Sequence, residues 1–91
     1  MTAREMPSLR QLRAFEAVAR LESVSAAARD IHLSQPGVSQ AIHALENGLD
    51  AQLFERRQSG CYVTASGAIL LPRVRRFLEY LRSALMEPGS P

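Results

Sequence analysis

The residues best suited to recognition chemistry are short polar side chains clustered just before the middle of the chain. Gln35, Ser39 and Gln40 carry amide or hydroxyl groups, and Ser34 and Pro36 belong to the same segment. Amide and hydroxyl side chains both donate and accept hydrogen bonds, which is the combination that reads base edges in the major groove of DNA. The first hypothesis is therefore recognition by hydrogen bonds from one exposed surface.

The residues that other chemistries require are missing or isolated in the sequence. The serines lack a histidine and carboxylate arrangement for nucleophilic catalysis, and no phosphate-loop motif occurs. His32 and His43 have no cluster of cysteines or carboxylates beside them, so we interpret them as turn and surface residues. Cys61 is the single cysteine and is interpreted as a small strand residue. We expect no catalysis, no metal and no cofactor.

A helix beginning after Ser34 would position the polar residues. Ser34 suits an N-cap, and Pro36 falls in the first turn, where a helix tolerates proline. Val38, Ile42 and Leu45 follow at helical spacing and predict a buried stripe. The remaining surface of this helix then carries four polar residues: Gln35, Ser39, Gln40 and His43.

Two helices are expected to precede this one. After Ser8, the expected first N-cap, apolar residues recur at three- and four-residue spacing up to position 19. A short second helix over 25–31, capped by Ser25, is followed by a turn at His32. Helices joined by so short a turn favour a helix-turn-helix, whose second helix enters the major groove N-terminus first.

The second half of the chain predicts a hairpin and then a long helix. Strands over 52–56 and 61–64 flank a segment of turn-forming composition. Thr64 is the expected N-cap of a helix over 65–86, because proline and glycine follow Met86 closely.

Leucine and valine recur through the last helix in a heptad pattern. The seam consists of Leu71, Val74, Leu78, Leu81 and Leu85. Leu70, Phe77 and Ala84 border the seam and make the apolar stripe too wide for one contact. Because one face suffices to pack a helix on its own small domain, we predict that the seam is a dimer interface. Packing of the whole stripe within one chain is the alternative.

The charge of the chain favours nucleic acid only weakly. The formal net charge is +2, and all 11 basic residues are arginine, which makes bidentate contacts with phosphates and bases. Within 34–63, Arg56 and Arg57 are opposed by three acidic residues, so a DNA-reading surface there depends on polar side chains and a helix N-terminus. Without a recognisable membrane span or signal peptide, the expected location is cytoplasmic, with no membrane partner.

Several segments match one known family in order and spacing. They are Phe15, Val18, Ser23-Val24-Ser25, Ala27-Ala28, Leu33 to Ser39, Ile42, Ala44-Leu45-Glu46, Leu53 to Arg56 and Val63 to Gly67. Over about residues 9–85 the chain resembles the N-terminal domain of bacterial LysR-type transcriptional regulators. The resemblance implies a mainly α fold, in which a winged helix-turn-helix of three helices and a small two-stranded wing precedes a long C-terminal dimerisation or linker helix. It also implies that a small-molecule effector would bind only a C-terminal domain that lies outside these residues.

Carried over to matching positions, the resemblance also implies a set of DNA contacts. Bases would be faced by Gln35, Pro36, Ser39 and Gln40. The DNA backbone would be contacted by Ser34, Arg56 and Thr64, to which we add Arg57. The expected organisation is a flexible N-terminus over 1–7, the DNA-binding domain over 8–64, the linker helix over 65–86 and a hinge or tail over 87–91. We expect the chain to read double-stranded DNA as a homodimer on an interrupted inverted repeat.

Some positions depart from the family pattern. Gln40 stands where arginine is frequent, which favours adenine over guanine. Asp50 stands where a helix-ending glycine is common, with Gly48 before it, so we expect the recognition helix to fray or end early. The rival function is a protein-interaction module that uses the last helix. Affinity for DNA that falls steeply with salt would separate the two functions.

Overall fold

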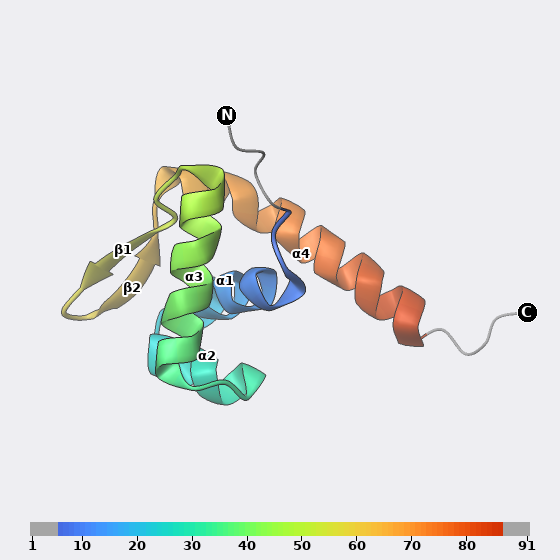
Figure 1. Ribbon diagram of the computed structural model, residues 1–91, viewed down its shortest axis with the longest axis horizontal. Helices are drawn as coiled ribbons and strands as arrows, with labels where there is room; N and C mark the ends of the chain where they lie inside the picture. Colours follow the sequence, from blue (N-terminus) through green and yellow to red (C-terminus); the bar gives the residue numbers. More distant parts are fainter. Residues whose placement is uncertain (1–5, 87–91) are drawn as a thin grey trace, which may run out of the picture.

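The computed structural model describes residues 6–86, which form four helices and one hairpin (Figure 1). In chain order the elements are α1 (Leu9–Leu21), α2 (Val24–Ile31), α3 (Gln35–Leu49), β1 (Phe54–Arg57), β2 (Gly60–Val63) and α4 (Ala65–Met86). This order confirms the mainly α winged helix-turn-helix followed by a long helix. The predicted flexible N-terminus and C-terminal tail fall mostly on residues 1–5 and 87–91, outside the described range.

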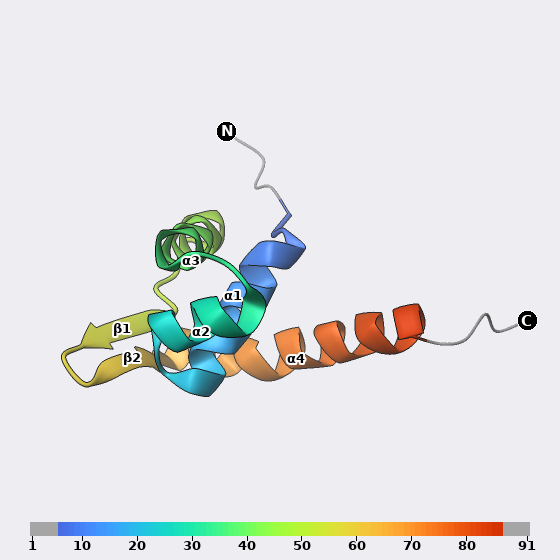
Figure 2. The same cartoon turned by 90° about the horizontal axis from the view of Figure 1, so that it is seen from below.

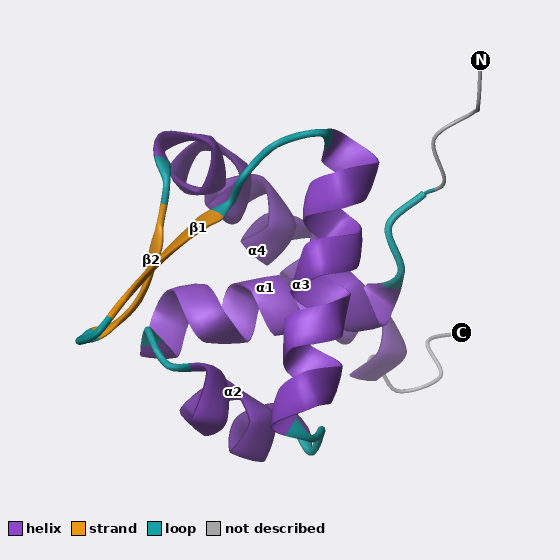
Figure 3. Ribbon diagram, turned by 60° about the vertical axis from the view of Figure 1, so that its left-hand side comes forward, coloured by secondary structure: helices purple, strands orange, loops and turns teal. Residues whose placement is uncertain are grey.

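Helices α1, α2 and α3 surround a small apolar core, with the wing at its edge (Figure 3). Phe15 of α1 is fully buried, and its ring centroid lies 5.5 Å from that of Phe54, the first residue of β1. Ala27 and Ala28 are buried on α2 and, having only a methyl side chain, permit close packing. The core therefore holds the helix-turn-helix and the wing as one unit.

The first two helices begin at serine caps. Ser8 forms a capping box with Gln11, because each residue's side chain accepts from the other's backbone N–H. For α2 the predicted cap at Ser25 is wrong: Ser23 has extended dihedral angles, and its hydroxyl accepts from the N–H of Ala26 at 3.0 Å. Ser25 lies inside the helix, where its hydroxyl is 3.2 Å from that of Ser23.

Helix α3 does not end early, contrary to the expectation drawn from Asp50. The helix continues to Leu49, and Asp50 adopts a left-handed conformation with φ 53°. The N–H of Asp50 bonds to the carbonyl of Asn47, and the N–H of Ala51 bonds to that of Glu46, which is the Schellman pattern. Aspartate tolerates this conformation better than most residues, so it replaces glycine here.

The hairpin is a two-residue reversal displaced slightly from its predicted strands. Phe54 pairs with Val63 and Arg57 with Gly60, so β1 begins later than expected, β2 begins and ends one residue earlier, and both strands reach closer to the turn. A Cβ at Gly60 would lie 2.8 Å from the carbonyl oxygen of Glu22, which also accepts from the N–H of Cys61. This close approach ties the wing to the turn between α1 and α2.

Helix α4 starts on the core and then extends away from it (Figure 2). Thr64 caps it as predicted, since its hydroxyl accepts from the N–H of Gly67 at 3.1 Å. Pro72 lies within the helix without ending it. Val74 is buried at 4% exposure, whereas Leu85 near the far end is 76% exposed.

Candidate nucleic-acid interface

Helix α3 has one buried apolar face and one polar face toward solvent, as its sequence predicts. Val38, Ile42 and Leu45 are buried at 0%, 2% and 1% exposure and pack into the core. The predicted base-reading residues lie outside it: Gln35, Pro36 and Gln40 are exposed, and Ser39 is half-buried. The first turns of α3 therefore present polar groups to solvent.

The amide side chains of this face are not used within the chain. Among residues 6–86, Gln35 and Gln40 make no side-chain hydrogen bond. At the N-terminus, the hydroxyl of Ser34 accepts from the N–H of Gly37 at 3.0 Å, which leaves the hydroxyl hydrogen available to a ligand. The helix dipole makes this end favourable for an anion such as phosphate.

Of the two wing arginines, Arg56 lies at the polar face of α3, whereas Arg57 interacts with other residues of the wing. Arg56 donates from Nη2 to the hydroxyl of Ser39 at 3.4 Å, so a predicted backbone contact lies beside a predicted base contact. Arg57 instead pairs with Glu55 at 3.0 Å, and its guanidinium carbon lies 5.6 Å from the ring centroid of Tyr62. Arg56 is thus the better placed of the two for DNA held against α3.

Thr64 has less capacity for a phosphate than the sequence suggested. Its hydroxyl donates to the carbonyl of Gln52 at 2.6 Å and accepts from the N–H of Gly67. Because its single hydrogen is used internally, a phosphate here would be held by the backbone amides at the start of α4 rather than by the hydroxyl.

Sequence reasoning assigned no functional role to two residues of α3, Glu46 and His43. Glu46 accepts two backbone N–H bonds at one carboxylate oxygen, from Leu53 at 2.8 Å and from Phe54 at 3.2 Å, and so positions the wing. The position of Glu46 in the alanine-leucine-glutamate run was the sequence signal from which a role could have been inferred. His43 is exposed, and its position four residues after Ser39 sets it on the same face of the helix.

Cys61 is a strand residue, as expected, and it is buried. It lies on β2 at 4% exposure, and burial raises the pKa of its thiol. The neighbouring charge of Arg56 acts in the opposite direction and Glu46 in the same direction, both less than burial. In the described part of the chain, no three histidine, cysteine or carboxylate residues group as metal ligands, and no helix is long and apolar enough to span a membrane.

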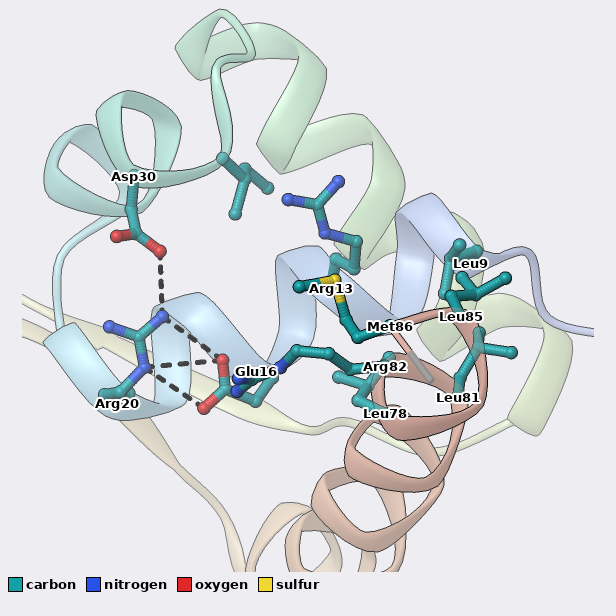
Figure 4. Close-up of a pocket in the computed structure, with 11 residues that line it drawn as sticks. Leu9, Arg13, Glu16, Arg20, Asp30, Leu78, Leu81, Arg82, Leu85 and Met86 are labelled. Atoms are coloured by element: carbon teal, nitrogen blue, oxygen red, sulfur yellow. Dashed lines mark hydrogen bonds and ion pairs between the residues drawn. The ribbon is translucent and has the colours of Figure 1, made fainter. Parts of the chain in front are cut away.

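A cleft of about 460 Å³ separates the end of α4 from α1 and α2 (Figure 4). Leu9, Leu78, Leu81, Leu85 and Met86 form its apolar wall. Glu16, Arg20 and Asp30 line another side of the cleft and form an ion-pair network. Arg75 of α4, outside the lining, also pairs with Glu16. The hydrogen bonds that Arg20 donates to Glu16, and secondarily to Asp30, raise the pKa of Arg20 further above its usual value. The network joins α4 and α2 to α1.

The predicted dimer seam divides into two parts. Val74 is buried in the chain's own core, and Leu71 and Leu78 pack against that core, so Val74 has no surface left for a second chain. Leu81 is half-buried, and Leu85 is exposed. Leu85 is therefore the seam residue that the described chain leaves most exposed.

A family model for bacterial regulatory helix-turn-helix proteins of the lysR family matches residues 9–68. The chain belongs to this family. Among curated LysR relatives, the transcriptional regulator TfdS of Cupriavidus pinatubonensis is 49% identical over 76 residues, which cover 84% of this chain and 26% of that protein. The regulator TrpI of Pseudomonas aeruginosa is 40% identical over 85 residues, which cover 93% of this chain and 29% of that protein. The chain thus spans about a quarter of these relatives' length.

Solved LysR-type structures match the fold closely. A complex of the CbnR DNA-binding domain with DNA has a TM-score of 0.79 at 39% identity, covering 85% of this chain and 88% of that one. The oxidized form of OxyR from Corynebacterium glutamicum has a TM-score of 0.88 at 39% identity, covering 92% of this chain and 26% of that one. The match to the isolated CbnR domain covers most of both chains, so the described fold corresponds to a LysR DNA-binding domain.

Proposed function

We propose that this chain reads double-stranded DNA in a sequence-specific manner, as the operator-reading module of a bacterial LysR-type transcriptional regulator. The observation that carries this proposal is the capped N-terminus of α3, where the side chains of Gln35 and Gln40 make no hydrogen bond within residues 6–86 and Arg56 lies against Ser39. Family membership supports it, as do the DNA complexes of similar domains from CbnR and BenM.

Each residue of this surface has a role in the proposal. Gln35, Pro36, Ser39 and Gln40 contact bases, and Gln40 suits adenine, to which an amide side chain can make two hydrogen bonds. Ser34, Arg56, Arg57 and Thr64 contact the DNA backbone, with Thr64 acting through the amides that follow it. Arg57 must first exchange its ion pair with Glu55 for a phosphate.

Two copies of the chain act together in this proposal. With a formal charge of +2, one copy offers few cationic contacts, so a single half-site is bound weakly. A two-fold dimer formed through the end of α4 would place two α3 helices on successive turns of DNA, on an interrupted inverted repeat. A small-molecule effector would act through a further C-terminal domain, and the regulator would work in the bacterial cytoplasm.

Selection of bound duplexes from a random pool tests this function, and two variants then test the roles. Gln35→Ala should weaken the selected site by about 1 to 3 kcal/mol and relax preference at one position of each half-site. Arg56→Ala should weaken every duplex similarly and flatten the plot of log affinity against log salt by about one unit. Recovery of no preferred sequence would contradict the function, and equal losses on selected and random duplexes would remove Gln35 from base reading.

A further inference from the structure

His43 lies on α3 and is not among the residues proposed above to contact bases or the DNA backbone. It follows Gln40 by three residues and Ser39 by four, so all three lie on one side of the helix. The side chain is exposed and, among residues 6–86, makes no hydrogen bond or ion pair. His32, the other histidine of the chain, instead ends α2 in a left-handed conformation with φ 59°.

His43 borders a hollow of about 400 Å³ between α3 and β1. Arg56 lines the same hollow from the wing, and Ile42 and Phe54 contribute apolar walls. The hydrogen bond from Arg56 to Ser39 places this lining residue beside the proposed base-reading face. A DNA strand passing between α3 and the wing would therefore approach His43 and Arg56 together.

Two carboxylates also line this hollow, and both are already engaged. Glu46 accepts two backbone N–H bonds from the start of β1, and Glu55 pairs with Arg57 at 3.0 Å. The guanidinium of Arg56 has no carboxylate partner in the described part of the chain and donates only to a hydroxyl. Among the residues that line the hollow, the groups able to attract an incoming anion are the guanidinium of Arg56 and, when protonated, the imidazole of His43.

We propose that His43 and Arg56 together bind one phosphate of the DNA backbone across the hollow between α3 and β1, so that protonation of His43 strengthens DNA binding. The inference rests on the proposed function. An imidazole changes charge between about pH 5 and 8, whereas guanidinium groups, carboxylates and phosphodiesters keep their charge in that range. Protonated imidazole donates to a phosphate oxygen, so binding is strongest at low pH and weakens as pH rises.

Binding titrations from pH 5.5 to 8.5 at constant ionic strength, on the duplex recovered by selection, test this inference. The wild-type chain should bind roughly two- to fivefold more tightly at pH 6 than at pH 8, the range expected for one exposed ion pair. Its log–log salt slope should be steeper at pH 6 by up to about one unit. His43→Gln should abolish both differences, and His43→Arg should bind tightly without pH dependence.

His32→Asn is the matched control, because asparagine tolerates the left-handed conformation of that position. It should keep the full pH dependence. The inference is overturned if the pH dependence persists in His43→Gln, if it disappears in His32→Asn, or if selection with His43→Gln recovers a different base preference. Salt-sensitive, sequence-selective binding without pH dependence would remove the His43 role alone, whereas the absence of selective binding would contradict the proposed function itself.

Discussion

Glu46 joins α3 to the wing through its side chain. One carboxylate oxygen accepts from the backbone N–H groups of Leu53 and Phe54, immediately where β1 begins. Leu53 and Phe54 are themselves buried, at 1% and 4% exposure. Loss of the carboxylate would leave buried backbone donors without a partner, which costs more than the hydrogen bonds contribute.

We expect Glu46→Gln to lower the free energy of unfolding by about 1 to 2 kcal/mol, because a neutral amide oxygen accepts these bonds less strongly than a carboxylate. Glu55→Gln is the matched control, since Glu55 is 57% exposed and pairs with Arg57 on the surface. Its effect should stay below about 0.5 kcal/mol. Urea unfolding monitored by circular dichroism measures both values, and equal losses would contradict the anchoring role of Glu46.

The capping roles of several residues could be predicted from their local chemistry. The caps at Ser8, Ser34 and Thr64 could be inferred because a cap bonds to amides only two or three residues away. The cap of α2 could not, because Ser23 and Ser25 both suit the position and the choice depends on where the core places the helix. The bonds of Glu46 join it to residues seven and eight positions away, which no local pattern specifies.

At the scale of elements, α4 crosses the start of β1 at very close range. A Cβ at Gly67 would collide with the carbonyl oxygen of Leu53 and lie 3.2 Å from the Cβ of Val63. The nearby N–H of Thr64 donates to that same carbonyl of Leu53 at 2.9 Å. Leu53 is held by this backbone hydrogen bond and Val63 by strand pairing, so neither residue can move away without losing that interaction.

Gly67→Ala should therefore destabilise the chain by about 1 to 3 kcal/mol, the range found for overpacked sites. Gly48→Ala is the control with the opposite expected change in stability, because a Cβ at Gly48 would meet nothing within 4 Å apart from its two chain neighbours and the nearby backbone of its own helix. Alanine should raise stability there by about 0.5 to 1 kcal/mol through its better helix propensity. Thermal unfolding of both variants gives the comparison, and a neutral Gly67→Ala would show that α4 can shift on the wing.

The order and type of the elements were predictable from the sequence, but their exact bounds and the contacts between them were less so. Periodicity identified α1, α3 and α4, since apolar residues at helical spacing report which face is buried. The wing strands were predicted about one or two residues out of place, because turn composition fits both a four-residue and a two-residue reversal. The bond from Cys61 to the carbonyl of Glu22, which fixes the wing, depends on the assembled fold.

The whole molecule is an asymmetric body, with principal extents of 49, 37 and 23 Å, from which α4 projects. The ion pair of Arg75 with Glu16 at 3.5 Å holds the first part of this helix against α1. Beyond Leu78, apolar side chains continue with less cover from the chain itself. Leu85 and Met86 are 76% and 73% exposed, and they lie on a helix that the family resemblance implies is a dimer contact.

Two copies of the chain are expected to pair through the side of α4 that carries Leu85. Leu85 continues the predicted seam past Leu81, whereas Tyr80, 71% exposed, lies on another side of the helix. Leu85→Arg would place an unpaired charge in the interface, which costs about 3 kcal/mol or more and weakens the dimer by roughly a hundredfold. Tyr80→Arg, the control, should leave the dimer intact. Both positions are exposed, so neither variant should unfold the domain.

Analytical ultracentrifugation across micromolar concentrations, paired with titrations on full and half operators, measures the outcome. Leu85→Arg should sediment as a monomer and bind the full operator only about as well as a half-site, because its two recognition helices are no longer linked. A folded Leu85→Arg that stays dimeric would contradict the seam, and loss of the dimer in Tyr80→Arg instead would assign pairing to the other side of α4. A wild-type chain that is monomeric at these concentrations would show that α4 alone does not hold the dimer, so that the pairing must come from outside these residues.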